Sequence, residues 1–209
     1  MKLHLVFLSR LLLCLAAAPA MAQTVYTNGP INGTTDAWNT NFGFVVSDTF
    51  VLSNNSTLTG LNFGAWLFPG DVLFDAEISI TSSEFGGTVY TDQVVNFTQS
   101  GCSGNQFGFN VCNETGTFPT AVNLAPGTYW LNIENSVVND DPVYWDENSG
   151  PSQASENSVG TIPSEAFTIL GTTGTTTTGG STPEPGSFML LGSGTLGLAG
   201  VLTRRLFKA

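Results

Sequence analysis

The chain has 209 residues and a formal net charge of −11 at pH 7, and its charges are strongly segregated along the sequence. All five Lys and Arg residues lie in the first ten or last six positions, whereas all 16 Asp and Glu residues lie between Asp36 and Glu184. The segment from Gln23 to Pro183 therefore has no cationic side chain, which excludes nucleic acid as a partner because phosphate binding needs clustered Lys and Arg. The missing Lys, Arg and His also exclude a Ser-His-Asp triad, a Lys Schiff base, a histidine-containing zinc site and a P-loop.

Residues 1–22 have the parts of a secretory signal peptide. Basic residues precede the apolar run Leu11–Ala18, and Ala20-Met21-Ala22 matches an A-x-A cleavage site. Cleavage there would make Gln23 the first residue of the mature chain. A lipoprotein signal at Cys14 is the less favoured alternative, because a bulky leucine precedes this cysteine where a small residue is expected.

The central segment, residues 23–170, has the composition of an all-β domain. Thr, Val, Asn, Gly and Phe are frequent there while Ala and Leu are scarce, which favours strands and turns over helices. Apolar and polar residues alternate in short runs between turn signals such as Pro126-Gly127, which fits a type II turn. We expect about eight to ten short strands in an antiparallel β-sandwich of jelly-roll type. The clearest runs are Phe42–Leu52, Thr57–Leu67, Val72–Thr81, Thr88–Phe97, Thr117–Leu124, Thr128–Glu134, Val143–Trp145 and Ala166–Leu170.

Two cysteines, Cys102 and Cys112, would remain after removal of the signal peptide. In an exported chain this pair predicts one disulfide, and a closed loop of this size stabilises the fold by about 2–3 kcal/mol on a chain-entropy model. The intervening residues are rich in Gly and Asn, so we expect a flexible excursion between two strands. A metal site made of the two thiolates is the less favoured alternative.

Two short acidic clusters flank the apolar run Pro142–Trp145. Carboxylate and amide oxygens are the ligands that Ca²⁺ prefers, so the clusters are a candidate calcium site, although their spacing matches no EF-hand loop. A pair of solvated acidic loops is the interpretation that we favour, and no other cofactor is expected. The candidate metal ligands are Asp140, Asp141, Asp146 and Glu147.

Four tryptophans, Trp38, Trp66, Trp130 and Trp145, could form a sugar-stacking surface or pack in the core, and core packing is the commoner role. Trp130 interrupts the alternating apolar face of Tyr129–Ile133, so its ring is expected on the opposite face of that strand. Trp130 and Trp145 are the candidate ligand-binding residues.

The C-terminal part divides into a linker and a hydrophobic tail. Residues 171–182 are only Gly, Thr and Ser, so they cannot contribute to a core and a flexible linker is expected. The tail runs from Pro183-Glu184-Pro185 through an uncharged segment at 187–203 to Arg204-Arg205. As a helix that segment is just long enough to span a bilayer, and the basic residues after it are expected to stay cytoplasmic.

This tail, residues 183–209, resembles the PEP-CTERM sorting signal of Gram-negative bacteria. The resemblance implies a single C-terminal membrane helix and processing near Pro-Glu-Pro by an exosortase, a membrane cysteine protease/transpeptidase. It also implies a cell-surface or extracellular-matrix location, with exopolysaccharide as a partner in biofilm or floc formation. The middle of the chain is similar to sandwich domains found upstream of such tails, through Leu124–Trp130, Tyr144–Asn148 and Pro163–Thr168.

Taken together, these features predict an exported, non-enzymatic structural or adhesive β-sandwich. A carbohydrate-binding module that recognises exopolysaccharide is an alternative. An acid-based glycosidase is a further alternative, since it needs only two carboxylates at a set separation. No pair of acids stands out by motif, however, and Arg or His to position a substrate is missing.

Overall fold

The computed structural model describes residues 23–139 and 141–174, and the predicted signal peptide, C-terminal helix and sorting tail lie outside these residues. Thirteen strands are present in the described part. They are β1 (Gln23–Thr27), β2 (Ala37–Asn39), β3 (Val45–Leu52), β4 (Ser56–Leu67), β5 (Asp75–Ser83), β6 (Gly86–Gly104), β7 (Asn110–Leu124), β8 (Gly127–Val137), β9 (Tyr144–Asn148), β10 (Ala154–Glu156), β11 (Gly160–Ile162), β12 (Ser164–Glu165) and β13 (Phe167–Thr173).

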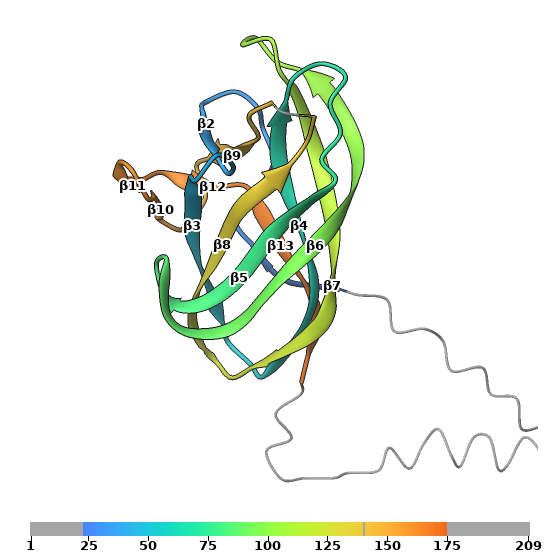
Figure 1. The fold of residues 1–209 in the computed structure, drawn as a ribbon. Coiled ribbons are helices and arrows are strands. Elements are labelled where there is room, and N and C mark those ends of the chain that lie inside the picture. Colours follow the sequence, from blue (N-terminus) through green and yellow to red (C-terminus); the bar gives the residue numbers. More distant parts are fainter. Residues whose placement is uncertain (1–22, 140, 175–209) are drawn as a thin grey trace, which may run out of the picture. The chain divides into compact units, whose positions relative to one another are not determined.

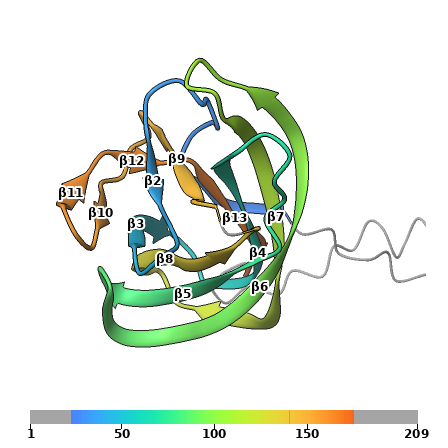
Figure 2. The ribbon, with the colours of Figure 1, turned by 45° about the horizontal axis from the view of Figure 1, so that its top comes forward.

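The strands form one antiparallel sheet with the order β1-β13-β4-β7-β6-β5-β8-β3-β10-β11, and β9 pairs with β2, β4 and β12 beside this path. The sheet curls around its own core (Figures 1 and 2). The sheet bends within β6, where the pairing partner changes: residues 86–96 pair with β5, and residues 97–104 pair with β7. Such coiling follows from the right-handed twist that long strands accumulate.

The all-β, antiparallel class that the sequence predicts is confirmed. The jelly-roll sandwich is not shown, because the hydrogen-bonded order runs without a break through β6 instead of separating into two sheets. No helix among residues 23–139 and 141–174 is long and apolar enough to cross a membrane.

The core lies inside the curl and is built from the inward-facing alternate residues of the long strands. Phe50, Phe63, Trp145 and Phe167 are among its largest fully buried side chains. Edge-to-face packing joins them, with ring centroids 6.1 Å apart for Phe63 and Trp145 and 5.6 Å apart for Trp145 and Phe167. Each such pair adds about 0.5–1.5 kcal/mol beyond the area that it buries.

The Cys102–Cys112 disulfide is confirmed, but the expected flexible excursion between the cysteines is wrong. Strands β6 and β7 continue past the bridge and end in a turn at Asn105, whose side-chain Oδ1 accepts the backbone N–H groups of Phe107 and Phe109. Glycine and asparagine serve here to shape a hairpin, with a bulge at Gly101, where φ is 61°.

The expected linker also begins later than predicted. Gly171–Thr173 belong to β13, which pairs with β1 on one side and β4 on the other. Backbone hydrogen bonds hold a strand in a sheet without large side chains, so a Gly/Thr composition does not exclude these residues from the domain. The compact unit that contains the described residues ends at Gly174.

Replacing both Cys102 and Cys112 by Ala should lower the free energy of unfolding by about 2–3 kcal/mol while the strand content is kept. The cross-link restricts the unfolded chain, and the β6–β7 hydrogen bonds remain without it. Urea unfolding followed by circular dichroism measures the change, with the reduced wild-type protein as the control. An unchanged unfolding midpoint would contradict this role of the bridge.

Candidate functional site

Three of the predicted site residues lie on β9, which is enclosed by β2, β4 and β12. Trp145 stands opposite Trp38 of β2 and Ala65 of β4, while Glu147 stands opposite Glu165 of β12. All three side chains are buried, but not on one face: Trp145 packs in the core, whereas Asp146 lies on the opposite face of β9, beneath the loop at Asn32 and Gly33. A strand that the sequence places between acidic loops is therefore a buried element.

Trp145 is a core residue. Its exposed fraction is 0 %, and its indole Nε1 donates a hydrogen bond to the carbonyl oxygen of Ala166 at 3.0 Å. A ring enclosed in this way cannot stack on a sugar. Trp130, the other candidate, is half-buried on β8, opposite Thr49 of β3 and Thr81 of β5.

Asp146 holds a loop against the sheet. Its carboxylate accepts the indole N–H of Trp66 at 2.6 Å and the backbone N–H groups of Asn32 and Gly33 at 2.8 and 2.9 Å. Burial raises the pKa of Asp146, and these hydrogen bonds oppose the rise. The side chain of this acid is thus occupied by neutral donors of the protein itself.

Glu147 is bound in a similar way. Its Oε2 accepts the indole N–H of Trp38 at 3.1 Å. Trp38 and Trp66 are thus each held by a carboxylate of β9, while Trp145 packs in the core and Trp130 lies on β8. The four tryptophans therefore form no common stacking surface.

Asp48 and Glu165 form a second buried acidic pair close to β9. The carboxylate of Asp48 accepts the backbone N–H of Glu165 at 2.8 Å and the side-chain amide of Asn28 at 3.0 Å. Burial raises the pKa of Asp48 to about 6, although its hydrogen bonds act in the opposite direction. Both carboxyl oxygens of Glu165 are buried without a partner, and burial followed by the nearby carboxylates raises its pKa well above the usual range.

Glu114, on β7, is a further buried acid. Its side chain is completely buried, and neither carboxyl oxygen has a hydrogen-bond partner. Burial raises the pKa of Glu114 to about 7. An ionised carboxylate without a partner is unstable in such a place, so the protonated acid is the form that the fold favours.

The predicted calcium ligands are not gathered by the described residues. Within residues 23–139 and 141–174, no three or more His, Cys, Asp or Glu side chains are arranged to hold a metal ion. Asp146 and Glu147 bind separate tryptophans, and Asp141 lies close to Asp71, where it adds to the effect of burial in raising the pKa of Asp71. Asp140 lies outside the described residues.

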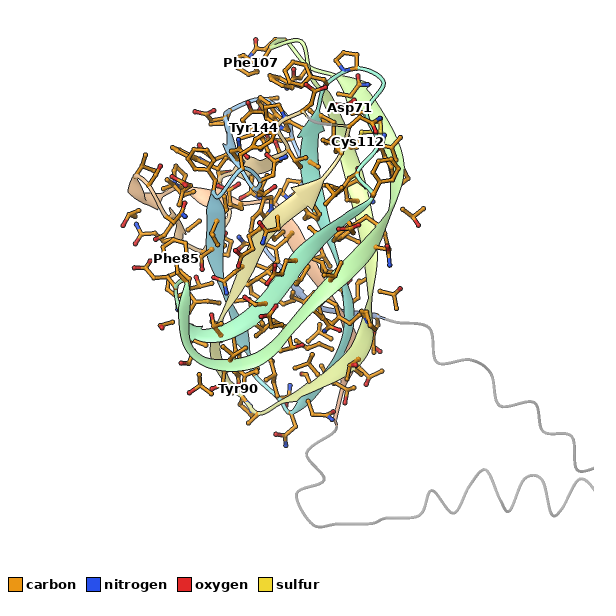
Figure 3. The ribbon with its side chains drawn as sticks, viewed as in Figure 1. Asp71, Phe85, Tyr90, Phe107, Cys112 and Tyr144 are labelled. Atoms are coloured by element: carbon orange, nitrogen blue, oxygen red, sulfur yellow. A yellow bond between two sulfur atoms is a disulfide. The ribbon has the colours of Figure 1, made fainter. Side chains whose placement is uncertain are left out.

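An aromatic cluster that the sequence analysis missed lies where β4, β6, β7 and β9 meet at one end of the sheet. The ring of Phe107 stacks on Trp66 with centroids 5.4 Å apart, and Phe109 contacts Phe68 and Tyr144 at 4.9 and 5.5 Å. Figure 3 shows Phe107 and Tyr144 together at this end of the molecule. The alternation of Phe107 and Phe109 is a sequence signal for this cluster, but the Gly and Asn residues around them predict a flexible loop instead.

Neighbouring connections add exposed apolar side chains to the same end, which we call the aromatic loop end. The connections β2–β3, β4–β5, β6–β7 and β8–β9 all lie here, because the strands between them run antiparallel (Figure 1). The exposed fraction is 63 % for Phe42 and 50 % for Phe107. The exposed members are Phe42, Phe44, Phe68, Val72, Phe74, Phe107 and Val137.

Both ends of the described chain lie at the other end of the sheet. Gln23 at the start of β1 pairs with Gly171 near the end of β13. Gly171 in turn pairs with Leu58, near the start of β4, whereas the aromatic loop end follows the last residues of β4. The first and last described residues, Gln23 and Gly174, therefore lie at the end of the sheet remote from the exposed phenylalanines (Figure 1).

Comparison with models of protein families finds the PEP-CTERM protein-sorting motif at residues 181–205. The chain carries a PEP-CTERM sorting motif. The matched range includes Pro183, Glu184, Pro185, Arg204 and Arg205, the residues that the sequence predicts for the signal. The chain matches no curated protein and no solved structure.

The PEP-CTERM motif indicates an exported protein that passes through a membrane-anchored intermediate and is a target of exosortase processing. The motif begins after β13 has ended, so none of the described residues belongs to it. Processing near Glu184 would leave the whole β-domain, including its buried acids and the aromatic loop end, in the exported product.

The buried acids predict a domain that is more stable in mild acid than at neutral pH. Asp48, Glu114 and Glu165 have pKa values above those of an unfolded chain, so the folded state binds more protons between the two values. The free energy of unfolding is therefore highest below the pKa values that these acids have in the unfolded chain, at about pH 4. It falls as the pH rises through the pKa values that they have in the folded state.

Glu114→Gln should remove part of this dependence. The difference in unfolding free energy between about pH 5 and pH 8 should shrink by roughly 1–3 kcal/mol, because the amide cannot ionise. Denaturant unfolding at a series of pH values measures it, and Glu84→Gln, at an exposed position, is the matched control. A wild-type protein whose stability rises steadily from pH 5 to pH 8 would show that these acids ionise freely.

Proposed function

We propose that this chain is a non-enzymatic structural or adhesive protein of the cell surface or extracellular matrix, associated with exopolysaccharide and biofilm formation. The observation that carries the proposal is the PEP-CTERM motif at residues 181–205, close behind the last strand of a disulfide-bridged β-domain. A disulfide suits an oxidising compartment outside the cytoplasm. The described part of the domain offers exposed aromatic side chains, which suit a module that makes contacts.

The aromatic loop end is the surface that we assign to adhesion. Exposed apolar side chains that are gathered at one end of a domain often mark an interaction surface, whereas single scattered ones need no explanation. Phe107 is held by stacking on Trp66, and its hairpin is closed by Cys102–Cys112, so the exposed ring is presented on a rigid support. Gln23 and Gly171 pair at the opposite end of the sheet, so neither described end of the chain lies on this surface.

Processing can be tested by intact-mass spectrometry of the protein from the cells that produce it. We expect a product that begins at Gln23 and ends near Glu184. Replacing Pro183, Glu184 and Pro185 by Ala should leave the tail through Ala209 in place and keep the protein in the membrane fraction. Thr176→Ala, in the segment before the motif, is the control. A wild-type protein that retains Ala209 would overturn exosortase processing.

Adhesion can be tested on the aromatic loop end. The variant Phe68→Ser/Phe107→Ser should reduce retention of the protein in isolated biofilm matrix several-fold, because two exposed rings of the contact surface are lost. Phe85→Ser removes an exposed phenylalanine from the β5–β6 turn and is the matched control. Equal retention of all three proteins would exclude the aromatic loop end as the adhesive surface, and unfolding midpoints establish that each variant is folded.

A carbohydrate-binding module remains the second candidate. Of the two predicted ligand-binding residues, only Trp130 is partly exposed, so it alone could stack on a sugar. Loss of glycan binding in Trp130→Ala would support this role for its ring.

Calcium bridging between acidic loops and a matrix is a further element of the proposal, and a rise in unfolding temperature on adding Ca²⁺ would support it.

An acid-based glycosidase is the less favoured proposal. One groove of about 280 Å³ is lined by Asp92 and Glu134, and burial followed by neighbouring acids raises the pKa of both. Two carboxylates in a groove are the minimum for glycoside hydrolysis. No Arg, Lys or His exists between Gln23 and Pro183 to position a substrate, and this is why we rank it lower.

A further inference from the structure

The outer surface of the curled sheet differs in charge between its two sides. On one side, Glu77 of β5, Asp92 of β6 and Glu134 of β8 lie close enough that their charges raise the pKa values of Asp92 and Glu134. On the other side, β1, β4, β13 and residues 97–104 of β6 contain no charged residue. The one charged residue of β7, Glu114, is buried on the inner face. We call this second side the neutral face.

A row of uncharged hydrogen-bonding side chains crosses the neutral face. Direct cross-strand pairing joins one residue from each of five adjacent strands, and the row spans about 19 Å at the usual strand spacing. None of these five side chains is buried. The row is Thr27 (β1), Thr168 (β13), Asn62 (β4), Thr115 (β7) and Thr98 (β6).

One part of this row lies in a groove of about 560 Å³. Thr27, Thr168 and Asn62 belong to its lining, together with Asn113 and the loop Gly29–Ile31. The groove is therefore bounded by a loop on one side and by polar side chains of β4, β7 and β13 on the other.

The loop wall is fixed to the sheet. The carboxylate of Asp146 accepts the backbone N–H groups of Asn32 and Gly33, the two residues that follow the wall. A Cβ atom at Gly64 would come within 2.9 Å of a side-chain carbon of Ile31, so only glycine at this position of β4 lets the loop approach so closely. The groove is consequently a preformed feature, as small-ligand sites usually are.

Hydrogen-bonding capacity remains unused on this face. Asn62 and Asn113 line the groove and are half-buried as residues, but the side-chain oxygen atom of each is shielded from solvent. Neither oxygen atom has a hydrogen-bond partner among the described residues, and the same is true of the hydroxyl group of Thr59 on β4. Buried polar atoms are nearly always paired, so unpaired amide groups beside a groove point to a ligand that donates hydrogen bonds. An Asn amide carries both an acceptor oxygen and N–H donors, so it can exchange hydrogen bonds with a hydroxyl group in either sense.

We propose that this groove binds a strand of uncharged polysaccharide, whose hydroxyl groups pair with Asn62, Asn113 and Thr168. A chain of hydroxyl groups supplies both donors and acceptors, as the amide and hydroxyl side chains of the row require. An anionic chain would meet no counter-charge on this domain and would be repelled by its carboxylates. A protein partner would need an apolar centre, and the exposed phenylalanines lie at the aromatic loop end instead.

An uncharged polysaccharide is one class of the exopolysaccharide with which we propose that the protein associates. The inference rests on that proposed function only for the source of the glycan. The test uses the processed protein purified from the cells that export it. Titration calorimetry would compare neutral probes, soluble glucan and mannan oligosaccharides, with an anionic probe, an alginate oligosaccharide. We expect binding of at least one neutral probe and none of the anionic probe.

Asn62→Ala and Asn113→Ala should each weaken neutral-glycan binding about three- to tenfold, the usual effect of losing one hydrogen bond. Asn96→Ala, an exposed asparagine of β6 that does not line the groove, is the matched control and should bind as the wild type does. Unfolding midpoints identify any variant that fails to fold. Hydrogen exchange on the wild-type protein is independent of the variants, and bound glycan should protect the backbone of Gly29–Ile31 and β4.

Each contrary result has a distinct meaning. Neutral-glycan binding that is unchanged in both variants, or protection elsewhere in the sheet, would overturn the groove as the site while the matrix association stands. Binding of alginate alone would overturn the uncharged ligand class. No glycan binding by a protein that is correctly processed at Glu184 would overturn this inference and leave sorting intact.

Discussion

The structure depends on placing carboxylates in a protein interior that has no cation to pair with them. Between Gln23 and Pro183 there is no Lys, Arg or His, yet Asp48, Asp146 and Glu165 are completely buried. Neutral donors take the place of the missing cations: indole N–H groups, an asparagine amide and backbone N–H groups. Where even these are missing, as at Glu114 and Glu165, burial disfavours the charged form and raises the pKa of the acid.

The same acids organise the surfaces. Asp146 joins the loop after Ile31 to Trp66 of β4, and through that one carboxylate it supports both the wall of the neutral groove and the aromatic loop end. Glu147 and Trp38 add a second link on the same strand. A network of this type depends on all of its members, because removing a donor leaves a buried acceptor without a partner.

The position of the chain ends gives the domain a direction. Gln23 and Gly171 are paired, so both described ends of the chain lie at one end of the sheet, opposite the exposed phenylalanines. The neutral and acidic sides lie between these ends. The domain thus has three chemically different surfaces: aromatic at the end remote from its termini, uncharged on one side and acidic on the other.

The sequence by itself determined the all-β class, most of the long strands, the disulfide and the sorting motif, because alternation, turn residues, two cysteines and a tripeptide are local patterns. It did not determine the continuous curled sheet, or that Trp145 and Asp146 are both buried, because burial depends on which distant segments cover β9. Asn28, Asp48 and Glu165 meet across separations of 20 and 117 residues, and no local pattern records such a meeting. Tertiary structure alone decided which acids are buried, since side chains far apart in sequence share an interior only after the sheet has closed around them.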